Sequence, residues 1–283
     1  MSAKVIDGRE ISSDIKDALK VSIKTGFIRA RRKPFLVVVL VGDDPASRSY
    51  IKIKQKACEY VGIETQMKHF AADCEQVELE DCIAELNKNE AVDGILIQLP
   101  LPADLDADYL LNTIDPGKDV DGLSPVNQGL LCSGQEGLFP CTPLGIMAMI
   151  KAINIPIKGK VAVIIGKSQL VGRPIARMLE DSGATVIVLH SRSENLEKFT
   201  ILADILISAA GRAHMVLGHW IKPGAAVIDV GNSWVGDQVR GDVEPEGARL
   251  KAGFLTPVPG GVGPMTVAFL LVNTVKSWQK SLL

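Results

Sequence analysis

The chain has little excess of charge of either sign. Its 283 residues include 31 lysines and arginines and 33 aspartates and glutamates, which gives a formal net charge of −2 at neutral pH. The basic residues are dispersed, whereas a nucleic-acid-binding protein needs them gathered on one face to neutralise phosphates. The composition therefore argues against nucleic acid as a partner and favours small molecules.

Long hydrophobic runs are also missing. The longest apolar strand-like run, FLVVVLV at residues 35–41, is far shorter than the roughly 20 residues that a membrane-spanning helix needs. The opening residues, MSAKVIDGRE, contain no apolar stretch of signal-peptide length. We therefore expect no membrane association and a cytoplasmic location.

Motifs for disulfides and metals are absent as well. An odd number of cysteines without any CxxC pair fits reduced thiols better than a disulfide framework, and the four histidines show neither HExxH spacing nor a nearby acidic cluster. The sequence thus predicts no metal site. The cysteines are Cys58, Cys74, Cys82, Cys132 and Cys141.

Strand and helix patterns alternate along the first half of the chain. Helical periodicity covers residues 9–31 and 77–87, apolar strand patterns cover 35–41, 63–70 and 95–99, and a helix from residue 46 ends at Gly62. This order predicts a parallel sheet, whose ligands gather at the carboxyl ends of its strands. Residues 129–140 lose periodicity and are the predicted linker to a second unit.

The helix at residues 46–61 carries a lysine on its apolar face. Its predicted apolar stripe contains Tyr50, Ile53, Ala57 and Val61, and Lys54 lies over the same face, four residues after the tyrosine. Such a lysine either extends its amine into water or is partly desolvated, which lowers its pKa and suits it to act as a base. The helix alone does not decide between these roles.

Two polar sites follow predicted strand ends. Gln98 closes the strand ILIQ before Leu99 and Pro100, and Asp121 lies in the segment KDVDG, residues 118–122. Each has an ordinary explanation, since glutamine can cap a strand and KDVDG can form a solvated turn. Their shared position at strand ends makes them candidates to meet Lys54.

The second half contains a nucleotide-binding pattern. Residues 160–192 read as strand, glycine turn, helix and strand, with Gly166, Ser168 and Gly172 in a GxSxxVG variant of the dinucleotide fingerprint. Backbone N–H groups and a helix N-terminus at such a turn bind a pyrophosphate, and Ser168 can add a hydroxyl donor. An α/β crossover without a ligand is the alternative.

The strand after this turn indicates the preferred nucleotide. It ends in His190-Ser191-Arg192-Ser193, where an NAD-binding protein would place an acid to hold the ribose hydroxyls. Ser191 and Arg192 would instead accept a 2′-phosphate, which predicts NADP, although Arg192 has the alternative of being an ordinary exposed arginine. Further strands at residues 203–211 and 225–231 are predicted to extend the sheet. The proline- and glycine-rich loop at residues 256–266 either provides a surface for a flat ligand or is a structured connector.

Five motifs in this order resemble the bifunctional methylenetetrahydrofolate dehydrogenase/methenyltetrahydrofolate cyclohydrolase family. They are PASxxYxxxKxKAC, DGILIQLPLP, KDVDG, GKSQLVGRP and TPVPGGVGPMT, and together they span nearly the whole chain. The resemblance implies NADP-dependent oxidation of 5,10-methylenetetrahydrofolate to the 5,10-methenyl cation and its hydrolysis to 10-formyltetrahydrofolate in one shared site. It places the chain in one-carbon metabolism, including tetrahydrofolate interconversion and purine biosynthesis.

The resemblance also implies roles for individual residues. Lys54 is the expected general acid/base, Gln98 its tuning partner, Tyr50 the ring that packs on the folate, and Asp121 the carboxylate that anchors the pterin. Further expected substrate contacts are Leu99, Pro100, Pro259, Gly260 and Gly261. Expected cofactor contacts are Gly166, Lys167, Ser168, Gly172, Arg173, Ser191, Arg192 and Asn232, the last within Asn232-Ser233-Trp234, which departs from the more usual Ile-Asn-Arg of the family.

The implied architecture is a two-domain α/β protein. A three-layer α/β folate-binding domain covers residues 1–139 plus 265–283, with the C-terminal helix packed back on it, and a Rossmann-type NADP-binding domain covers residues 140–264. The family also implies a homodimer formed through the cofactor domain. Two alternatives are a short-chain-type dehydrogenase using Tyr50 and Lys54 as a YxxxK pair, which the motif order disfavours, and an NADP- or folate-binding regulatory module without turnover.

Overall fold

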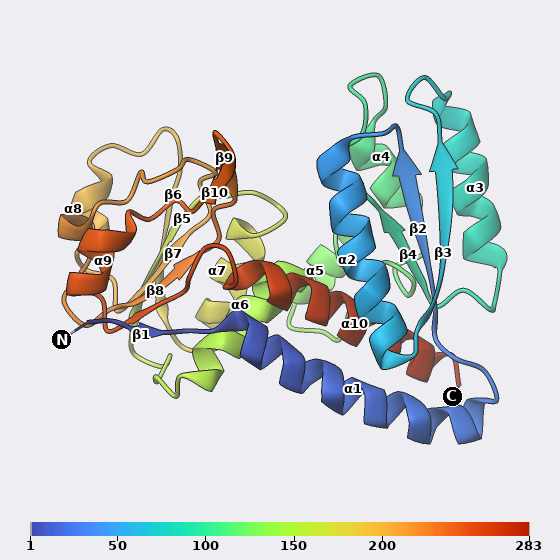
Figure 1. Cartoon of the computed structure of the whole chain (residues 1–283), viewed down its shortest axis with the longest axis horizontal. Coiled ribbons are helices and arrows are strands. Elements are labelled where there is room, and N and C mark those ends of the chain that lie inside the picture. The colour runs from blue at the N-terminus through green and yellow to red at the C-terminus, as the bar shows by residue number, and fades with distance from the viewer. Residues whose placement is uncertain (1, 283) are drawn as a thin grey trace. The chain divides into compact units, whose positions relative to one another are not determined.

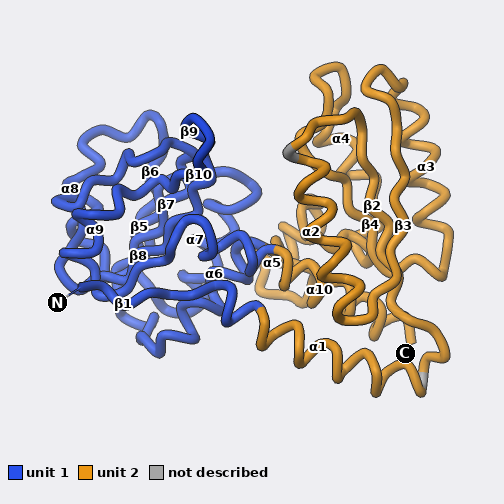
Figure 2. Tube along the Cα trace, in the orientation of Figure 1, with its two compact units in different colours: residues 1–12, 142–266 blue, residues 13–141, 267–283 orange. Residues whose placement is uncertain are grey.

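The computed structural model describes residues 2–282, apart from the side chains of Arg29 and Ala46, and the chain divides into two compact units (Figure 2). Unit 1 comprises residues 1–12 and 142–266, and unit 2 comprises residues 13–141 and 267–283. The internal boundaries lie two residues beyond those predicted. Residues 1–12, which were predicted to belong to the folate-binding domain, group with unit 1, where the short strand β1 (Lys4–Val5) pairs with β11 (Phe254–Leu255).

Unit 1 is built on a six-stranded parallel sheet in the order β1-β11-β8-β7-β5-β6 (Figure 1). The chain moves from β5 to β6 on one side and then crosses to β7 on the other, which is the reversal that creates a nucleotide site in doubly wound folds. The remaining strands are β5 (Val161–Ile165), β6 (Thr185–Leu189), β7 (Ile205–Ser208), β8 (Ala226–Asp229), and the antiparallel hairpin β9 (Ser233–Val235) and β10 (Gln238–Arg240). Its helices are α6 (Cys141–Ala152), which begins at the boundary, α7 (Gly172–Asp181), α8 (Leu196–Thr200), the 3-10 turn η1 (Gly218–Trp220) and α9 (Pro245–Lys251).

Unit 2 has three layers around a parallel sheet in the order β3-β2-β4. Strand β2 (Phe35–Val41) lies between β3 (Glu64–Phe70) and β4 (Gly94–Ile97). The helices are α1 (Gly8–Ala30), which starts in unit 1, α2 (Pro45–Val61), α3 (Gln76–Lys88), α4 (Ala107–Thr113), α5 (Pro125–Cys132) and α10 (Val262–Lys280), most of which lies in this unit. None of the helices within residues 2–282 is both long and apolar enough to cross a bilayer.

Alternate side chains of β2 enter two separate hydrophobic cores. Leu36, Val38 and Leu40 pack with residues of α1, α2 and α10, whereas Val37 and Val39 pack with residues of α3 and α4. Figure 1 shows α2 and α3 on opposite sides of the sheet. Because strand side chains alternate between faces, an unbroken apolar run is what a centre strand covered on both faces requires. The predicted three-layer α/β fold and the return of the C-terminal helix are confirmed.

Helix α2 has strong signals at both ends. Asp44 caps its start by accepting a hydrogen bond from the Ser47 N–H over 2.8 Å, and Pro45 occupies the first turn. Gly62 ends the helix in the left-handed conformation, with φ of 95°. These signals determine where α2 begins and ends.

The predicted linker at residues 129–140 is only partly irregular. Helix α5 continues to Cys132, and the segment belongs to unit 2 up to Cys141. Ser124 caps this helix by accepting the Asn127 N–H, and Pro125 follows at the first helical position. The glycine and polar content of residues 129–140 obscured a short helix that these two residues begin.

Candidate active site

Lys54 lies at the centre of the buried face of α2. That face consists of Ser47, Ile51, Lys54, Cys58 and Val61, and the whole Lys54 residue is only 7% exposed. Ile53, which the sequence placed in the apolar stripe, is 54% exposed. The predicted stripe was therefore rotated away from the buried face, although Lys54 lies on that face as predicted.

The amine of Lys54 has a defined hydrogen-bond partner. Its Nζ donates to Oε1 of Gln98 over 3.0 Å, and Nε2 of Gln98 donates to the backbone oxygen of Leu99 over 2.7 Å. The amine also lies 5.4 Å from the centre of the Tyr50 ring. Helix α2 and the end of β4 thus bring together three of the predicted residues, with Gln98 held in one orientation.

Burial shifts the titration of the groups around this amine. It lowers the pKa of Lys54, against the charge of Asp121, which raises it. Burial likewise raises the pKa of Asp121, with nearby Lys54 opposing the shift, and it raises the pKa of the Tyr50 phenol. Desolvation disfavours each charged form, so it favours a neutral amine beside a neutral phenol.

A clamped turn presents Asp121. The buried carboxylate of Asp119 accepts N–H hydrogen bonds from Gly122 at 3.0 Å and Ser124 at 2.8 Å, and it also accepts one from Nδ2 of Asn127 at 3.0 Å. Gly122 has φ of 73°, which favours glycine. KDVDG is therefore a largely buried, ordered turn whose backbone is held by the Asp119 carboxylate. The charge of Asp121, in the same turn, acts on the Lys54 amine and raises its pKa.

The sequence missed two residues beside Asp121. The Cys141 thiol donates to the Val120 oxygen over 3.3 Å, and burial, together with the nearby charge of Asp121, raises the pKa of this thiol well above the ordinary range. Asn273 of α10 donates to the Val120 oxygen over 2.8 Å. The cysteine appeared in the sequence only as a packing thiol, and no spacing pattern connects Asn273 to a loop 153 positions earlier.

The predicted nucleotide turn in unit 1 has no room for a side chain at its two glycines. A Cβ at Gly166, where φ is 114°, would lie 2.3 Å from the Ala209 oxygen, and one at Gly172 would lie 2.0 Å from the Gly166 oxygen. Ser168 Oγ accepts the Val171 N–H over 3.2 Å at the start of α7, and a hydroxyl that accepts still has a proton to donate. Lys167, Ser168 and Arg173 are exposed around this turn.

The proposed 2′-phosphate residues lie at the end of the neighbouring strand. The Gly166 N–H donates to the Leu189 oxygen over 2.8 Å, which places the end of β6 beside the glycine turn. His190 Nδ1 accepts the Arg192 N–H over 3.1 Å, and this turn leaves Ser191 and Arg192 exposed. The structure thus brings the two parts of the predicted cofactor site to one edge of the sheet.

The end of β8 is fixed by a buried carboxylate. Asp229 accepts the N–H groups of Gly231 and Asp242 at 2.9 Å each, and Val243 donates to its other oxygen at 2.9 Å. Burial raises the pKa of Asp229 to about 6, against these hydrogen bonds, which lower it. Asn232 follows this anchored backbone and is exposed.

The predicted substrate loop, residues 256–266, is also part of unit 1. A Cβ at Gly261 would lie 2.6 Å from the Pro257 oxygen, and Gly260 has φ of 108°. The loop therefore needs glycine at both positions, while Pro259 is exposed. It lies in a different unit from Lys54, so the pairing of its three predicted contacts with the Lys54 group belongs to the proposed function.

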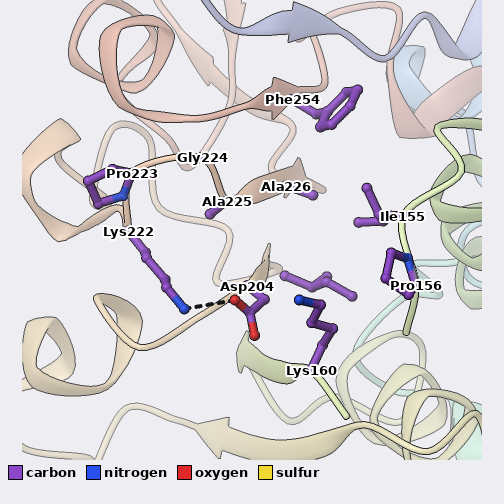
Figure 3. A pocket seen from close by; sticks show the side chains of 11 residues that line it. Ile155, Pro156, Lys160, Asp204, Lys222, Pro223, Gly224, Ala225, Ala226 and Phe254 are labelled. Carbon is purple, nitrogen blue, oxygen red and sulfur yellow. Dashed lines mark hydrogen bonds and ion pairs between the residues drawn. The ribbon is translucent and has the colours of Figure 1, made fainter. Parts of the chain in front are cut away.

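A separate cavity of about 170 Å³ opens at the opposite edge of the sheet in unit 1 (Figure 3). Its lining includes Lys160, Asp204 and Ala225, which precede β5, β7 and β8. Lys222 Nζ pairs with Asp204 over 2.7 Å in its wall. The cavity lies at the amino ends of strands, whereas the glycine turn follows a carboxyl end, so the two are distinct.

Between residues 2 and 282, no group of three or more histidine, cysteine or acidic residues is arranged to hold a metal.

Comparison with known proteins gives matches over nearly all of the chain. Residues 6–121 match the catalytic domain of tetrahydrofolate dehydrogenase/cyclohydrolase, and residues 140–282 match the NAD(P)-binding domain of the same family. The bifunctional protein FolD of Halothermothrix orenii is 48% identical over 276 residues, which are 97% of each chain.

Solved structures of the same family are also similar to this chain over nearly its whole length. The bifunctional enzyme FolD, a methylenetetrahydrofolate dehydrogenase/cyclohydrolase, from Campylobacter jejuni is 44% identical with a TM-score of 0.96, covering 99% of both chains. The methylenetetrahydrofolate dehydrogenase-cyclohydrolase of Trypanosoma brucei, solved with NADP cofactor and inhibitor, is 37% identical with a TM-score of 0.96, again covering 99% of both chains. The chain therefore belongs to the tetrahydrofolate dehydrogenase/cyclohydrolase family.

Proposed function

We propose that Lys54 serves both reactions of this bifunctional NADP-dependent methylenetetrahydrofolate dehydrogenase and methenyltetrahydrofolate cyclohydrolase, within one shared site. The first reaction oxidises 5,10-methylenetetrahydrofolate to the 5,10-methenyl cation, and the second adds water to give 10-formyltetrahydrofolate and a proton. The observation that supports this most directly is the buried amine of Lys54 at 3.0 Å from the Gln98 amide oxygen.

Hydrolysis needs a base more than an electrophile. The methenyl carbon already carries positive character, so the attacking water must lose a proton as the new C–O bond forms. A neutral Lys54 amine can accept that proton, and burial increases the neutral fraction near physiological pH. Gln98 accepts a hydrogen bond from the amine without adding a charge that would fix it as an ammonium.

Substrate binding is assigned to groups around this amine. The half-buried ring of Tyr50 offers a face for the pterin, and Asp121 offers a carboxylate that can hydrogen-bond the N–H groups of the pterin. We further assign Leu99, Pro100, Pro259, Gly260 and Gly261 to the walls of the folate site. On this assignment residues 13–139 with the C-terminal helix form the folate-binding part, and residues 140–264 form the NADP-binding part.

The residues of unit 1 fit NADP. Bound NADP accepts the hydride from the methylene carbon. The glycine turn at Gly166 and Gly172 excludes any Cβ, so backbone N–H groups and the start of the ten-residue helix α7 can approach a pyrophosphate. We assign Ser168 and Arg173, with Lys167, to the phosphates, Ser191 and Arg192 to the 2′-phosphate, and Asn232 to the nicotinamide end.

Two alternatives from the sequence lose support. A regulatory module without turnover does not agree with the bifunctional relatives matched over 97% of each chain. A short-chain-type dehydrogenase would use Tyr50 as a base, whereas burial raises the pKa of its phenol and keeps it protonated. Tyr50 and Lys54 also belong to unit 2, and the glycine turn belongs to unit 1.

We also propose a homodimer formed through the cofactor domain, and a cytoplasmic location. Support for the dimer comes from β6, which pairs only with β5 among the strands of residues 2–282 and exposes 37% of Val188. Support for the location comes from the five cysteines, all of which are free thiols. Light scattering of the purified protein would test the dimer, and a monomer at micromolar concentration would contradict it.

The activity itself is tested with purified protein, 5,10-methylenetetrahydrofolate and either nicotinamide nucleotide. We expect NADPH to appear at 340 nm and methenyltetrahydrofolate to be consumed in a separate assay that starts from that compound. Absence of NADPH formation with a sample that hydrolyses methenyltetrahydrofolate would contradict the dehydrogenase assignment. Absence of hydrolysis would contradict the cyclohydrolase assignment.

A further inference from the structure

Asn273 of α10 joins the two chain segments that flank Asp121. The residue is 2% exposed. Its Nδ2 donates to the Val120 oxygen over 2.8 Å and to the Phe139 oxygen over 2.9 Å, and it lies 3.6 Å from Cys141 Sγ. One amide group therefore holds the KDVDG turn and the segment that leads to Cys141 against the C-terminal helix.

The two joined segments meet at van der Waals contact. A Cβ on Gly122 would lie 2.3 Å from the Phe139 carbonyl carbon, so the backbones already touch beside Asp121. The Cys141 thiol donates to the Val120 oxygen, directly before Asp121, over 3.3 Å. Movement of either segment would change where the carboxylate and the thiol stand relative to Lys54.

A second asparagine, Asn127, bonds to the same pair of segments. Asn127 donates to Asp119 over 3.0 Å and accepts the Leu138 N–H over 3.2 Å. Asn127 thus connects both segments to helix α5, whereas Asn273 connects both segments to α10. Asn273 alone of these two contacts the backbone oxygen that directly precedes Asp121.

We propose that Asn273 is a positioning residue for the hydrolysis reaction, acting by fixing Asp121 and Cys141 in place against Lys54 and keeping water out of the space between them. This inference rests on the proposed role of Lys54. Without the amide, the partly buried Phe139 oxygen would lose its donor and the Val120 oxygen would keep only the weak thiol donor of Cys141, so both would draw in water or shift until they found another partner. Either response would solvate the surroundings of the amine.

The groups that control the titration of Lys54 all lie near this joint. They are Asp121 and Cys141 from the joined segments, Cys58 from α2 itself, Tyr50 one turn earlier, and Asp119, which acts on Asp121. Burial is the largest influence on the Lys54 pKa, ahead of each of these charges. Added water would therefore raise the pKa of the amine toward its ordinary value and reduce the neutral fraction at pH 7.

The test is the pH dependence of hydrolysis in Asn273→Leu, which keeps the approximate size of the side chain and removes the donor. We expect kcat at pH 7 to fall about tenfold per folded molecule, and the acidic limb of the kcat profile to move to higher pH by at least about half a unit. NADP affinity should stay within about twofold, because the cofactor residues belong to unit 1.

Thr274→Val is the matched control. Thr274 is the next residue of α10, is fully buried, and donates only within its own helix, to the Leu270 oxygen over 2.8 Å. Its replacement should lower thermal stability while leaving the pH profile unchanged. If Asn273→Leu lowers thermal stability but keeps the wild-type kcat and leaves the acidic limb of the kcat profile at its wild-type pH, the inference is wrong.

Failure of the variant to fold is covered by Asn273→Ser, which retains one shorter donor. In Asn273→Ser the acidic limb of the kcat profile should also move to higher pH, by a smaller amount. An acidic limb at the wild-type pH in this variant would also overturn the inference. Lys54→Ala separates the two levels of the proposal. Retained hydrolysis in Lys54→Ala would contradict the proposed function, whereas an inactive Lys54→Ala beside an unmoved Asn273→Leu profile would contradict only the positioning role.

Discussion

Lys54 and Gln98 form a hydrogen bond of 3.0 Å between a buried amine and a neutral amide oxygen. A buried lysine in a protein usually pairs with a carboxylate, which favours the charged ammonium form. The glutamine instead supplies an acceptor without a net charge, and its own amide is fixed by the Leu99 oxygen at 2.7 Å. The pair therefore combines a fixed orientation with a lowered pKa.

Replacement of Lys54 by alanine should remove hydrolysis while keeping the cofactor site. We expect the cyclohydrolase kcat to fall by about 10²-fold or more, the usual loss on removing a general base. NADP affinity should remain within about twofold by fluorescence titration. Lys56→Ala is the control, since Lys56 is on the same helix and exposed. Wild-type hydrolysis in Lys54→Ala would show that the amine has no part in the reaction.

Replacement of Gln98 by glutamate should shift the working pH upward. A carboxylate about 3 Å from the amine favours the ammonium and raises the Lys54 pKa by about one to three units. The acidic limb of the hydrolysis profile should move to higher pH by that amount, and activity should partly return in alkaline buffer. Gln98→Met removes both hydrogen bonds without adding charge, and we expect it to slow the reaction without this shift. An unmoved limb in Gln98→Glu would mean that Lys54 is not the titrating base.

Much of the fold could be predicted because its signals are local. Strand β2 is an unbroken apolar run that only a doubly covered strand needs, and the ends of α2 are marked by Pro45 and Gly62. The glycine turn was found because strand and helix patterns flank it. The grouping of residues 1–12 with unit 1 was not predicted, because β1 is two residues long and pairs with Phe254 and Leu255, a contact without a local pattern.

The residues of the candidate site could be predicted where they follow strands, and could not where they act through the backbone. Gln98 and Asp121 stand at or beyond strand ends, so parallel-sheet geometry predicts that they meet. Asn273 was missed because its partners are main-chain oxygens of Val120 and Phe139, which any residue type would provide. Lys54 itself was placed over the apolar face, but the sequence left open whether its amine is buried, because a long side chain on such a face can also extend its amine into water.

Replacement of Arg192 by aspartate should change the choice of nucleotide. We expect the Kd for NADP to rise by about 10- to 100-fold, which corresponds to loss of one charged hydrogen bond and added repulsion, with less than about threefold change for NAD. Arg249→Asp makes the same charge change at another exposed position in unit 1 and should affect both nucleotides little. Equal weakening of NADP and NAD by Arg192→Asp would contradict the 2′-phosphate assignment.

The buried carboxylate of Asp229 should give unit 1 a distinctive pH dependence of stability. Its folded pKa of about 6 lies above the ordinary value of 3.8, so between these two pH values the folded chain holds more protons than the unfolded chain. The free energy of unfolding should therefore fall as pH rises from about 4 to about 6, by at most about 3 kcal/mol from this group.

The measurement compares urea unfolding of the wild type and Asp229→Asn across this pH range. Fluorescence of Trp220 and Trp234, which belong to unit 1, reports on this unit in a Trp278→Phe background that removes the tryptophan of unit 2. The variant should be less stable at every pH, since an amide nitrogen would face backbone N–H donors. Its disadvantage should shrink as pH rises toward 6, because only the wild type loses stability there. Asp237→Asn, at an exposed position of the hairpin, should follow the wild-type curve. A constant difference between wild type and Asp229→Asn would show that the three N–H donors outweigh burial and hold the pKa of Asp229 near its ordinary value.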